Sequence, residues 1–175
     1  MRAGRTGASI PRIDGPNLER VMGFIERRLG DLRIELPEPS RPGANYVPFL
    51  RSGALLFLTG QLSQWNGERR FLGKLGREFG VAEGREAARL CALNLIAHLR
   101  RALEGDLDRV RRCVRVAGFV NSMPDFTGQS QVIDGASDLF VELFGEAGRH
   151  TRMAIGVAAL PYGVAVEVEA VFEVK

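Results

Sequence analysis

The sequence predicts an α+β fold in which helices cover one face of a mixed, largely antiparallel sheet. Helical and extended patterns follow one another along the 175 residues in the order helix, two strands, helix, strand, helix, two strands. Short turn signals separate the strands of each predicted pair, and this favours hairpins. We find no internal repeat of the kind that marks a solenoid. A chain of this length is expected to form one domain with a sizeable core.

The N-terminal part of the chain divides into three expected segments. Residues 1–15 are rich in arginine but lack an apolar stretch, so they predict a flexible terminus rather than a secretory signal. Residues 16–33 predict an amphipathic helix, because apolar residues recur at helical spacing after Pro16. Residues 35–43 contain three prolines and a glycine and predict an extended connector.

Two strands are expected next, at residues 45–50 and 54–61, with a turn at residues 51–53. Pro48 lacks a backbone N–H, so the first strand is predicted to lie at an edge of the sheet. The second strand is almost entirely apolar until Thr59, a pattern that predicts burial on both faces.

The middle of the chain contains the clearest helical pattern. Residues 64–80 are polar and glycine-rich and predict a loop, with a short strand around residues 71–75. Residues 82–103 predict a long helix that ends near Gly105. Residues 113–121 are rich in valine and predict a strand.

The C-terminal third predicts a loop, a helix and two strands. Residues 121–135 are polar and predict the loop, and residues 136–144 predict the helix. The strands are expected at residues 152–160 and 164–174, separated by the turn residues Pro161-Tyr162-Gly163. The last strand alternates between apolar residues and mainly polar ones, which predicts burial on one face only.

Composition excludes several classes of protein. No apolar run approaches the length of a bilayer span, so we expect no transmembrane helix. The net charge is only +3, and the one basic cluster is better interpreted as a solvated helix-to-strand junction than as a nucleic-acid surface, so nucleic-acid binding is not expected. This cluster consists of Arg109, Arg111, Arg112 and Arg115.

Cysteine and histidine usage argues against a metal site. Cys91 and Cys113 form no CxxC motif, and His98 and His150 cannot complete a plausible zinc set with them. We expect both thiols to be buried and reduced, as in a cytoplasmic protein.

The residues with the most chemical interest lie at strand ends and beside glycines. Arg152 begins an otherwise apolar strand, and its planar guanidinium can hold a carboxylate through two hydrogen bonds. Glu167 lies among valines on what we expect to be the adjacent strand, where its proton affinity can be raised for acid–base chemistry. From the residues alone, a structural ion pair between them or simple solvent exposure is the favoured interpretation.

Two further positions are open to both interpretations. The Thr59-Gly60 pair ends an apolar strand, where a glycine allows a ligand to approach the backbone, although a simple bulge is equally consistent. Tyr46 offers a ring and a hydroxyl group, but a half-buried strand tyrosine usually serves packing.

Four motifs in this order resemble a known family. They are Tyr46-Val47 through Leu58-Thr59-Gly60-Gln61, the run from Ala88 to Leu103 followed by Leu107-Asp108-Arg109-Val110, the stretch from Arg152 to Leu160-Pro161, and Val166-Glu167-Val168-Glu169-Ala170. Over residues 44–175 the chain resembles the reactive-intermediate (imine) deaminases, also called the YjgF-type or liver perchloric-acid-soluble-protein (L-PSP endoribonuclease) family. The helix at residues 16–33 lies outside that pattern and is typical of a longer subgroup.

The resemblance implies a chorismate-mutase-like α+β fold, a homotrimer and ligand sites between subunits. It also implies hydrolysis of reactive enamines and imines such as 2-aminoacrylate, which gives a 2-oxo acid and ammonia without a metal or organic cofactor. Such a substrate bears a small carboxylate group.

The resemblance also assigns roles to individual residues. Arg152 matches the arginine that holds the substrate carboxylate, and Glu167 matches the glutamate that positions water. The cleft is expected to be lined by Tyr46, Thr59, Gly60, Ala154 and Phe140. Ala154 replaces a cysteine found in many members, so only its backbone would contact the ligand, and Phe140 is expected to take the place of an aromatic residue.

Two alternatives to a deaminase remain open from the sequence. The same cleft could bind or sense a small carboxylate without turnover. The RNA-cleaving, translation-inhibiting activity attached to the family name is a weaker alternative, because the sequence shows no aromatic residues interleaved with its basic cluster.

Overall fold

A computed structural model describes residues 22–41 and 43–175 of the chain. Its helices are α2 (Phe24–Asp31), α3 (Val81–Ala102) and α4 (Gln129–Phe144). Its strands are β1 (Phe49–Ser52), β2 (Leu55–Leu62), β3 (Gln64–Trp65), β4 (Glu68–Arg69), β5 (Val110–Asn121), β6 (Thr151–Val157) and β7 (Val166–Val174). The terminus expected to be flexible, residues 1–15, and the first part of the helix expected at 16–33 lie outside the described residues.

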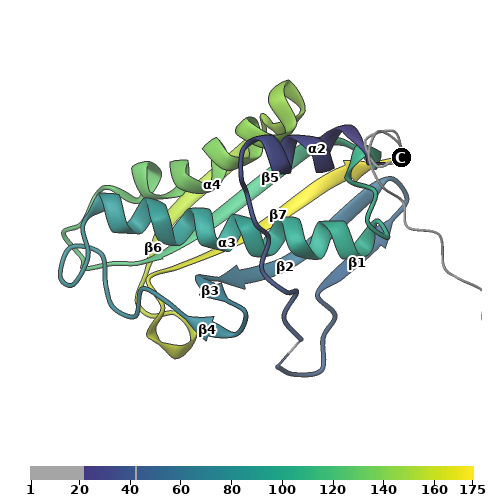
Figure 1. Ribbon diagram of the computed structural model, residues 1–175. Helices are drawn as coiled ribbons and strands as arrows, with labels where there is room; N and C mark the ends of the chain where they lie inside the picture. Colours follow the sequence, from purple (N-terminus) through teal and green to yellow (C-terminus); the bar gives the residue numbers. More distant parts are fainter. Residues whose placement is uncertain (1–21, 42) are drawn as a thin grey trace, which may run out of the picture.

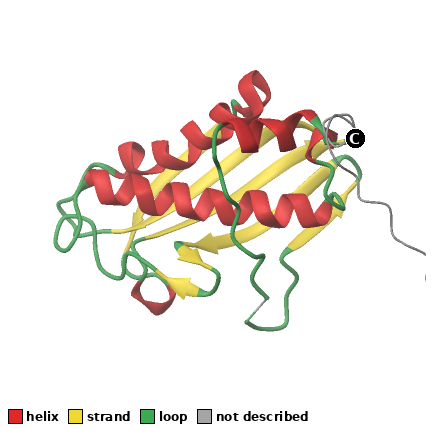
Figure 2. Ribbon diagram, in the orientation of Figure 1, coloured by secondary structure: helices red, strands yellow, loops and turns green. Residues whose placement is uncertain are grey.

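Five strands form one mixed sheet in the order β1-β2-β7-β5-β6. The β5–β6 pair is parallel and the other three pairs are antiparallel. The helices α2, α3 and α4 all lie over the same face of this sheet (Figures 1 and 2). The predicted α+β arrangement, with helices on one face of a mixed sheet, is therefore confirmed.

The core fills the space between the sheet and the helices. Along β7, residues 166, 168, 170, 172 and 174 are buried and alternate with partly exposed ones, as the period of a strand requires. Phe172 of β7 packs edge-to-face on Phe140 of α4, with the ring centroids 5.5 Å apart. Each large apolar side chain buried in this way contributes roughly 1.5–3 kcal/mol to folding.

The long helix α3 agrees with its prediction to within one residue at each end, whereas α4 begins seven residues before the expected position. The earlier start follows from Val132 and Ile133, which are fully buried and extend the apolar stripe of α4 toward its N-terminus. Gly135 allows α4 to lie close to α3, because a Cβ there would come within 2.0 Å of the Arg85 carbonyl oxygen.

The helix expected at residues 16–33 is confirmed over α2, which begins at Phe24 after the extended residue Gly23. The Asp108 carboxylate accepts hydrogen bonds from the backbone N–H groups of Phe24 and Ile25 at 2.7 and 2.8 Å. These two bonds satisfy free donors in the first turn of the helix. The helix is thereby fixed to the segment that precedes β5.

The first strand pair agrees with the prediction in topology but not in burial. The strand β1, which follows Pro48, lies at the edge of the sheet as expected. In β2, Leu56 and Leu58 are buried, but Leu55 and Phe57 are 36% and 44% exposed. The expectation that β2 is buried on both faces is therefore wrong, because none of the described helices covers the second face of the sheet (Figure 2).

The expected hairpin between the last two strands does not form. Strand β5 lies between β6 and β7, and β6 pairs with β5 in a parallel arrangement. The residues Pro161–Gly163 form a 3₁₀ turn within the connection from β6 to β7. A turn signal fixes only the local change of direction, so it could not reveal that an earlier strand separates its two neighbours.

The segment 64–80, expected to be a loop, contains a small hairpin made by β3 and β4. Its turn residues Asn66 and Gly67 have φ angles of 50° and 86°. Two positive φ values are the signature of the tight turn that Asn-Gly favours. This hairpin fixes the position of Arg69, which faces Gln64 in the register.

Candidate functional site

A bulge in β2 organises the candidate site. The pairing of β2 with β7 passes from Leu58–Ala170 to Gln61–Val168, so Thr59 and Gly60 together face a single residue of β7. The Thr59 hydroxyl donates a 2.8 Å hydrogen bond to the Val47 carbonyl oxygen and thereby fixes the segment that precedes β1.

Gly60 is required at the bulge because the Glu167 carboxylate lies beside it. A Cβ built at position 60 would lie 2.2 Å from Glu167 Oε1, which is shorter than any permitted contact. Glu167 extends from β7, where it is paired in the register with Leu62 of β2. The two sequence-predicted residues Gly60 and Glu167 are therefore in direct proximity.

Glu167 is a partly buried acid without a partner. Among the residues that the structure describes, no side chain or backbone group forms a hydrogen bond or ion pair with its carboxylate. Burial raises the pKa of Glu167, and the neighbouring charge of Glu169 raises it further. An unpaired carboxylate with increased proton affinity is suited to exchanging protons with a bound water or substrate.

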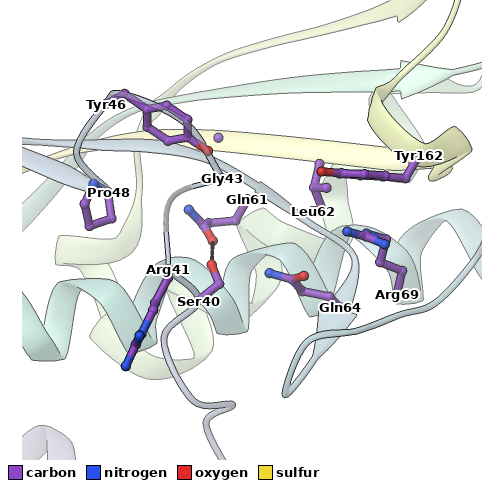
Figure 3. A pocket seen from close by; sticks show the side chains of 11 residues that line it. Ser40, Arg41, Gly43, Tyr46, Pro48, Gln61, Leu62, Gln64, Arg69 and Tyr162 are labelled. Carbon is purple, nitrogen blue, oxygen red and sulfur yellow. Dashed lines mark hydrogen bonds between the residues drawn. The ribbon is translucent and has the colours of Figure 1, made fainter.

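A pocket of about 190 Å³ lies beside this bulge (Figure 3). It is lined by the β2 residues Gly60, Gln61 and Leu62, by Tyr46, and by residues of the connector, the β3–β4 hairpin and the turn that contains Tyr162. Its volume is below the roughly 300–1,000 Å³ typical of pockets for drug-sized ligands, so it suits a smaller molecule.

A second hollow extends from the bulge across the uncovered face of the sheet. Thr59 and Tyr46 line it together with Glu169 and Arg115, which form an ion pair at 3.3 Å. The exposed ring of Tyr46 borders both hollows, Gly60 lines the first and Thr59 the second. Glu167 lies beside Gly60, so these four residues form one cluster.

Arg152 lies elsewhere and is held by α4. One terminal nitrogen, Nη1, donates hydrogen bonds to Asp134 Oδ1 at 2.7 Å and to Ser137 Oγ at 3.1 Å. The other, Nη2, donates a 2.8 Å hydrogen bond to Ser130 Oγ. A guanidinium has five N–H donors. Within the described parts of the chain, Nε–H and one N–H of Nη2 therefore have no acceptor.

The two predicted catalytic residues point to opposite faces of the sheet. Arg152 faces Val116, which is buried beneath the helices, and its side chain bonds to α4. Glu167 alternates with the buried Val166 and Val168, so it lies on the uncovered face. The expectation that the two residues lie on adjacent strands is wrong, because β5 separates β6 from β7. A single subunit therefore does not bring them together.

The remaining two predicted cleft residues also lie on the helix side. Ala154 packs partly buried against the core. Phe140 is fully buried between Phe172 and His150, so its ring does not reach a cleft, and its predicted role is corrected. The apolar residues of α4 recur at helical spacing, and this signal of core packing identifies Phe140 as structural.

Sequence reasoning missed several residues of the pocket, namely Ser40, Gln61, Arg69 and Tyr162. The Ser40 hydroxyl donates a 3.5 Å hydrogen bond to Gln61 Oε1 (Figure 3). Ser40 Oγ also lies 3.4 Å from Nε2 of the buried His98. The Asn66-Gly67 turn signal could have located Arg69, since it predicts the hairpin that presents this side chain.

The histidines and cysteines have the surroundings of structural residues rather than of catalytic or metal-binding ones. Burial lowers the pKa of both His98 and His150, and neither histidine lines the pocket. Both cysteines are free and buried, and burial raises the pKa of Cys113 to about 12. Across residues 22–41 and 43–175, no group of three His, Cys, Asp or Glu side chains could hold a metal ion. No helix in the same ranges is long and apolar enough to cross a membrane.

The basic cluster is partly neutralised. Arg111 and Arg112 each lie 3.4 Å from a carboxylate oxygen of the same residue, Glu173, and Arg115 pairs with Glu169. These contacts agree with the interpretation of a solvated junction, because they reduce the charge that the cluster presents to a phosphate backbone.

Comparison with more distant structures shows the fold alone. TdcF from E. coli, whose crystal structure contains bound serine, is 23% identical to this chain. The TM-score is 0.54, and the match covers 80% of this chain and 93% of TdcF.

More similar proteins match over most of their length. Protein TCP17 of Trypanosoma cruzi is 48% identical over 154 residues, which cover 87% of this chain and 96% of that protein. Atu1372 from Agrobacterium tumefaciens, a protein with unknown function, is 45% identical with a TM-score of 0.81, and the match covers 86% of this chain and 92% of Atu1372. A "putative endoribonuclease" from Shewanella oneidensis is 36% identical with a TM-score of 0.83, and the match covers 87% of this chain and all of that one.

Residues 26–173 match the family described as "YjgF/chorismate_mutase-like, putative endoribonuclease". The chorismate-mutase-like fold and the YjgF-type resemblance are thereby confirmed. Because this match and the similar proteins span most of the chain, the protein belongs to the YjgF/chorismate-mutase-like family.

Proposed function

We propose that the protein hydrolyses small, carboxylate-bearing enamines and imines, of which 2-aminoacrylate is the simplest, to a 2-oxo acid and ammonia. The observation that carries this proposal is the Glu167 carboxylate. It is partly buried, unpaired within the described chain, raised in pKa and adjacent to the Gly60 bulge beside a small pocket.

The proposed reaction needs only proton transfer and positioning. An enamine such as 2-aminoacrylate first gains a proton on carbon and loses one from nitrogen, which gives the imine. Water then adds to the carbon of the C=N bond, and Glu167 accepts a proton from that water and passes it to nitrogen. The hydroxyl proton of the resulting carbinolamine also moves to nitrogen, and the C–N bond breaks. Ammonia leaves and a C=O bond forms, so one water is consumed for each ammonia released. An imine carbon is already electrophilic, and therefore a positioned carboxylate is a sufficient catalyst.

Arg152 is proposed to hold the substrate carboxylate from a neighbouring subunit. Its free Nε–H and Nη2–H groups suit a two-bond contact with a carboxylate. Its position on the edge strand β6 places it at the border of the sheet, whereas the Gly60 bulge lies near the other edge. In a closed ring of identical subunits, such opposite edges meet, as a heterologous interface requires.

We therefore propose a homotrimer as the working form. The face of the sheet that lacks helices exposes the large apolar side chains Leu50, Leu55, Phe57, Met153 and Ile155. Several large apolar side chains exposed on one face are typical of an interaction site. Association through this face would give Glu167 a more buried environment, and the meeting of opposite sheet edges would bring Arg152 of one subunit toward Glu167 of the next.

RNA cleavage, which the family description mentions, is less consistent with the geometry. His98 and His150 are outside the pocket, and three arginines of the basic cluster are paired with glutamates. A site in which Glu167 lies beside Gly60 at the border of a small pocket suits a small molecule better than a nucleic-acid strand. The two free, buried cysteines fit the proposal that the protein works in the reducing cytoplasm.

Ammonia release from 2-aminoacrylate tests the proposal, with the substrate generated in place by a serine dehydratase. Wild type should accelerate release, Glu167→Gln should not, and Glu173→Gln, on the same face of the same strand, should behave as wild type. If wild type gives no acceleration, the protein is not this deaminase. Binding of 2-oxo acids without turnover would then indicate a sensor, and cleavage of RNA by wild type would support an endoribonuclease function.

A further inference from the structure

One cation in the pocket has no role in the proposed reaction. The guanidinium carbon of Arg69 lies 3.5 Å from the ring centroid of Tyr162, and the two groups are stacked face to face (Figure 3). Arg69 forms no ion pair and no side-chain hydrogen bond with any other described residue. The stacking engages the face of the guanidinium and leaves its in-plane N–H groups free to bind an anion.

Both partners of this stack are held in place by the backbone. Arg69 lies on β4, in a hairpin whose register is fixed by the Asn66-Gly67 turn. Tyr162 has φ 58° and ψ 10°, in the left-handed region that non-glycine residues rarely adopt. Residues with a strained backbone conformation of this kind cluster at active sites and ligand-binding sites.

The charged side chains that line the pocket, among the described residues, are all positive. Within the described chain, the residues that line it include Arg41 and Arg69 but no acidic residue. Figure 3 shows the Arg41 side chain pointing away from the stack, so Arg69 is the cation that faces the pocket beside Gln64. The adjacent Arg70 is different, because it lies 3.6 Å from the Glu68 carboxylate. The nearby carboxylate of Glu68 therefore pairs with Arg70, and Arg69 has no ion-pair partner among the described residues.

We propose that Arg69 binds a second carboxylate of the substrate, so that the preferred substrates are imines or enamines of dicarboxylic amino acids. This inference rests on the proposed function. The pocket connects Gly60, which touches Glu167, with Arg69 at the hairpin. A substrate whose reacting carbon lies by Glu167 can therefore extend toward Arg69. Arg152 of the neighbouring subunit holds the carboxylate next to the reacting carbon, and Arg69 holds the distant one.

The test compares substrates that differ only in the distant group. An amino-acid oxidase generates the imines of aspartate and asparagine, or of glutamate and glutamine, in place. Wild type should show a kcat/KM for at least one diacid imine that is about tenfold or more above that of its amide. Arg69→Gln should reduce the ratio of the diacid rate to the amide rate to about one, and Arg70→Gln should retain the preference. Equal rates of wild type on both members of each pair would overturn the proposal. So would an equal loss on diacid and amide in Arg69→Gln, because Arg69 would then hold the carboxylate common to all substrates.

A binding measurement separates this proposal from the proposed function. Calorimetric titration with 2-oxoglutarate and with 2-oxopentanoate compares a diacid with a monoacid of equal chain length. Tighter binding of 2-oxoglutarate by wild type, lost in Arg69→Gln and kept in Arg70→Gln, supports the second carboxylate site even if no imine is hydrolysed. Equal affinity of wild type for the two acids would overturn the site even if imines are hydrolysed.

Discussion

The Glu167 carboxylate occupies the space that a side chain at position 60 would need, with Oε1 only 2.2 Å from the Cβ that Gly60 lacks. This relationship explains why the bulge in β2 contains glycine. The bulge also explains the surroundings of Glu167, because it allows the carboxylate to lie against β2 without a hydrogen-bond partner in the described chain.

Gly60→Ala should therefore disturb function more than stability. The new methyl group must displace the end of the Glu167 side chain, which can rotate at small cost, but the carboxylate then leaves its position beside the pocket. We expect kcat/KM for imine hydrolysis to fall by about tenfold or more, while the melting temperature changes by only a few degrees. Gly30→Ala is the control, because a Cβ there meets nothing within 4 Å. Unchanged turnover in Gly60→Ala would show that the position of Glu167 does not matter.

Glu167→Gln should stabilise the protein at neutral pH. Burial and Glu169 raise the pKa of Glu167 in the folded state, so the folded protein binds this proton more tightly than the unfolded chain does. Ionisation therefore costs stability as the pH rises from the usual glutamate pKa through the raised one, and the full cost is present above both. Denaturant unfolding should show the variant to be more stable than wild type at pH 7. The difference should vanish below the usual glutamate pKa, where both forms are neutral. A variant that is less stable at pH 7 would show that the ionised Glu167 is stabilised by contacts.

Variants of Asp134 and Arg152 should distinguish a loss of stability from a loss of catalysis. Asp134 accepts a hydrogen bond from Arg152 at 2.7 Å and a longer one from Arg85 at 3.4 Å. Asp134→Asn weakens both contacts between charged groups, and we expect it to cost about 1–2 kcal/mol of unfolding free energy while turnover is largely retained. Arg152→Gln should lower kcat/KM by at least about a hundredfold, since it removes the group that holds the substrate carboxylate. Thermal melts and imine hydrolysis measured on both variants check this, and equal losses of activity would assign Arg152 a purely structural role.

The uncovered face of the sheet should control assembly. Phe57→Glu places a charge among the exposed apolar residues of this face, and a buried charge without a partner is strongly unfavourable. We expect light scattering to show dissociation to monomers, with loss of activity at the same protein concentration. Phe24→Glu is the control, because Phe24 is also exposed but lies on α2, on the other side of the sheet. An active, undissociated Phe57→Glu protein would place the interface elsewhere.

Local signals in the sequence predicted most of the elements correctly. The helical spacing within α3 and the alternation within β7 both arise from burial against one neighbour, so each pattern was sufficient to locate its element. The start of α4 was missed because Gly128, Gly135 and the polar residues between them hide the two buried positions Val132 and Ile133. The Asn66-Gly67 hairpin was missed although its turn signal is strong.

The order of strands could not be read from the sequence. The insertion of β5 between β6 and β7 depends on contacts between residues far apart in the chain, and no turn signal records them. This one difference separates Arg152 from Glu167 within a subunit, and for this reason the proposed site takes them from two subunits. By contrast, the proximity of Gly60 and Glu167 follows from the pairing of β2 with β7 at the bulge.

The most direct test of the shared site is to mix two inactive variants. Arg152→Gln and Glu167→Gln subunits are unfolded together in equal amounts and refolded, with wild type treated in the same way as the control. In a trimer with one Arg152 and one Glu167 from different subunits at each site, random assembly restores about one quarter of the sites. We therefore expect about one quarter of the wild-type rate of ammonia release from the mixture, and none from either variant alone. No recovery in a mixture shown by mass spectrometry to contain both kinds of subunit would contradict a site shared between subunits.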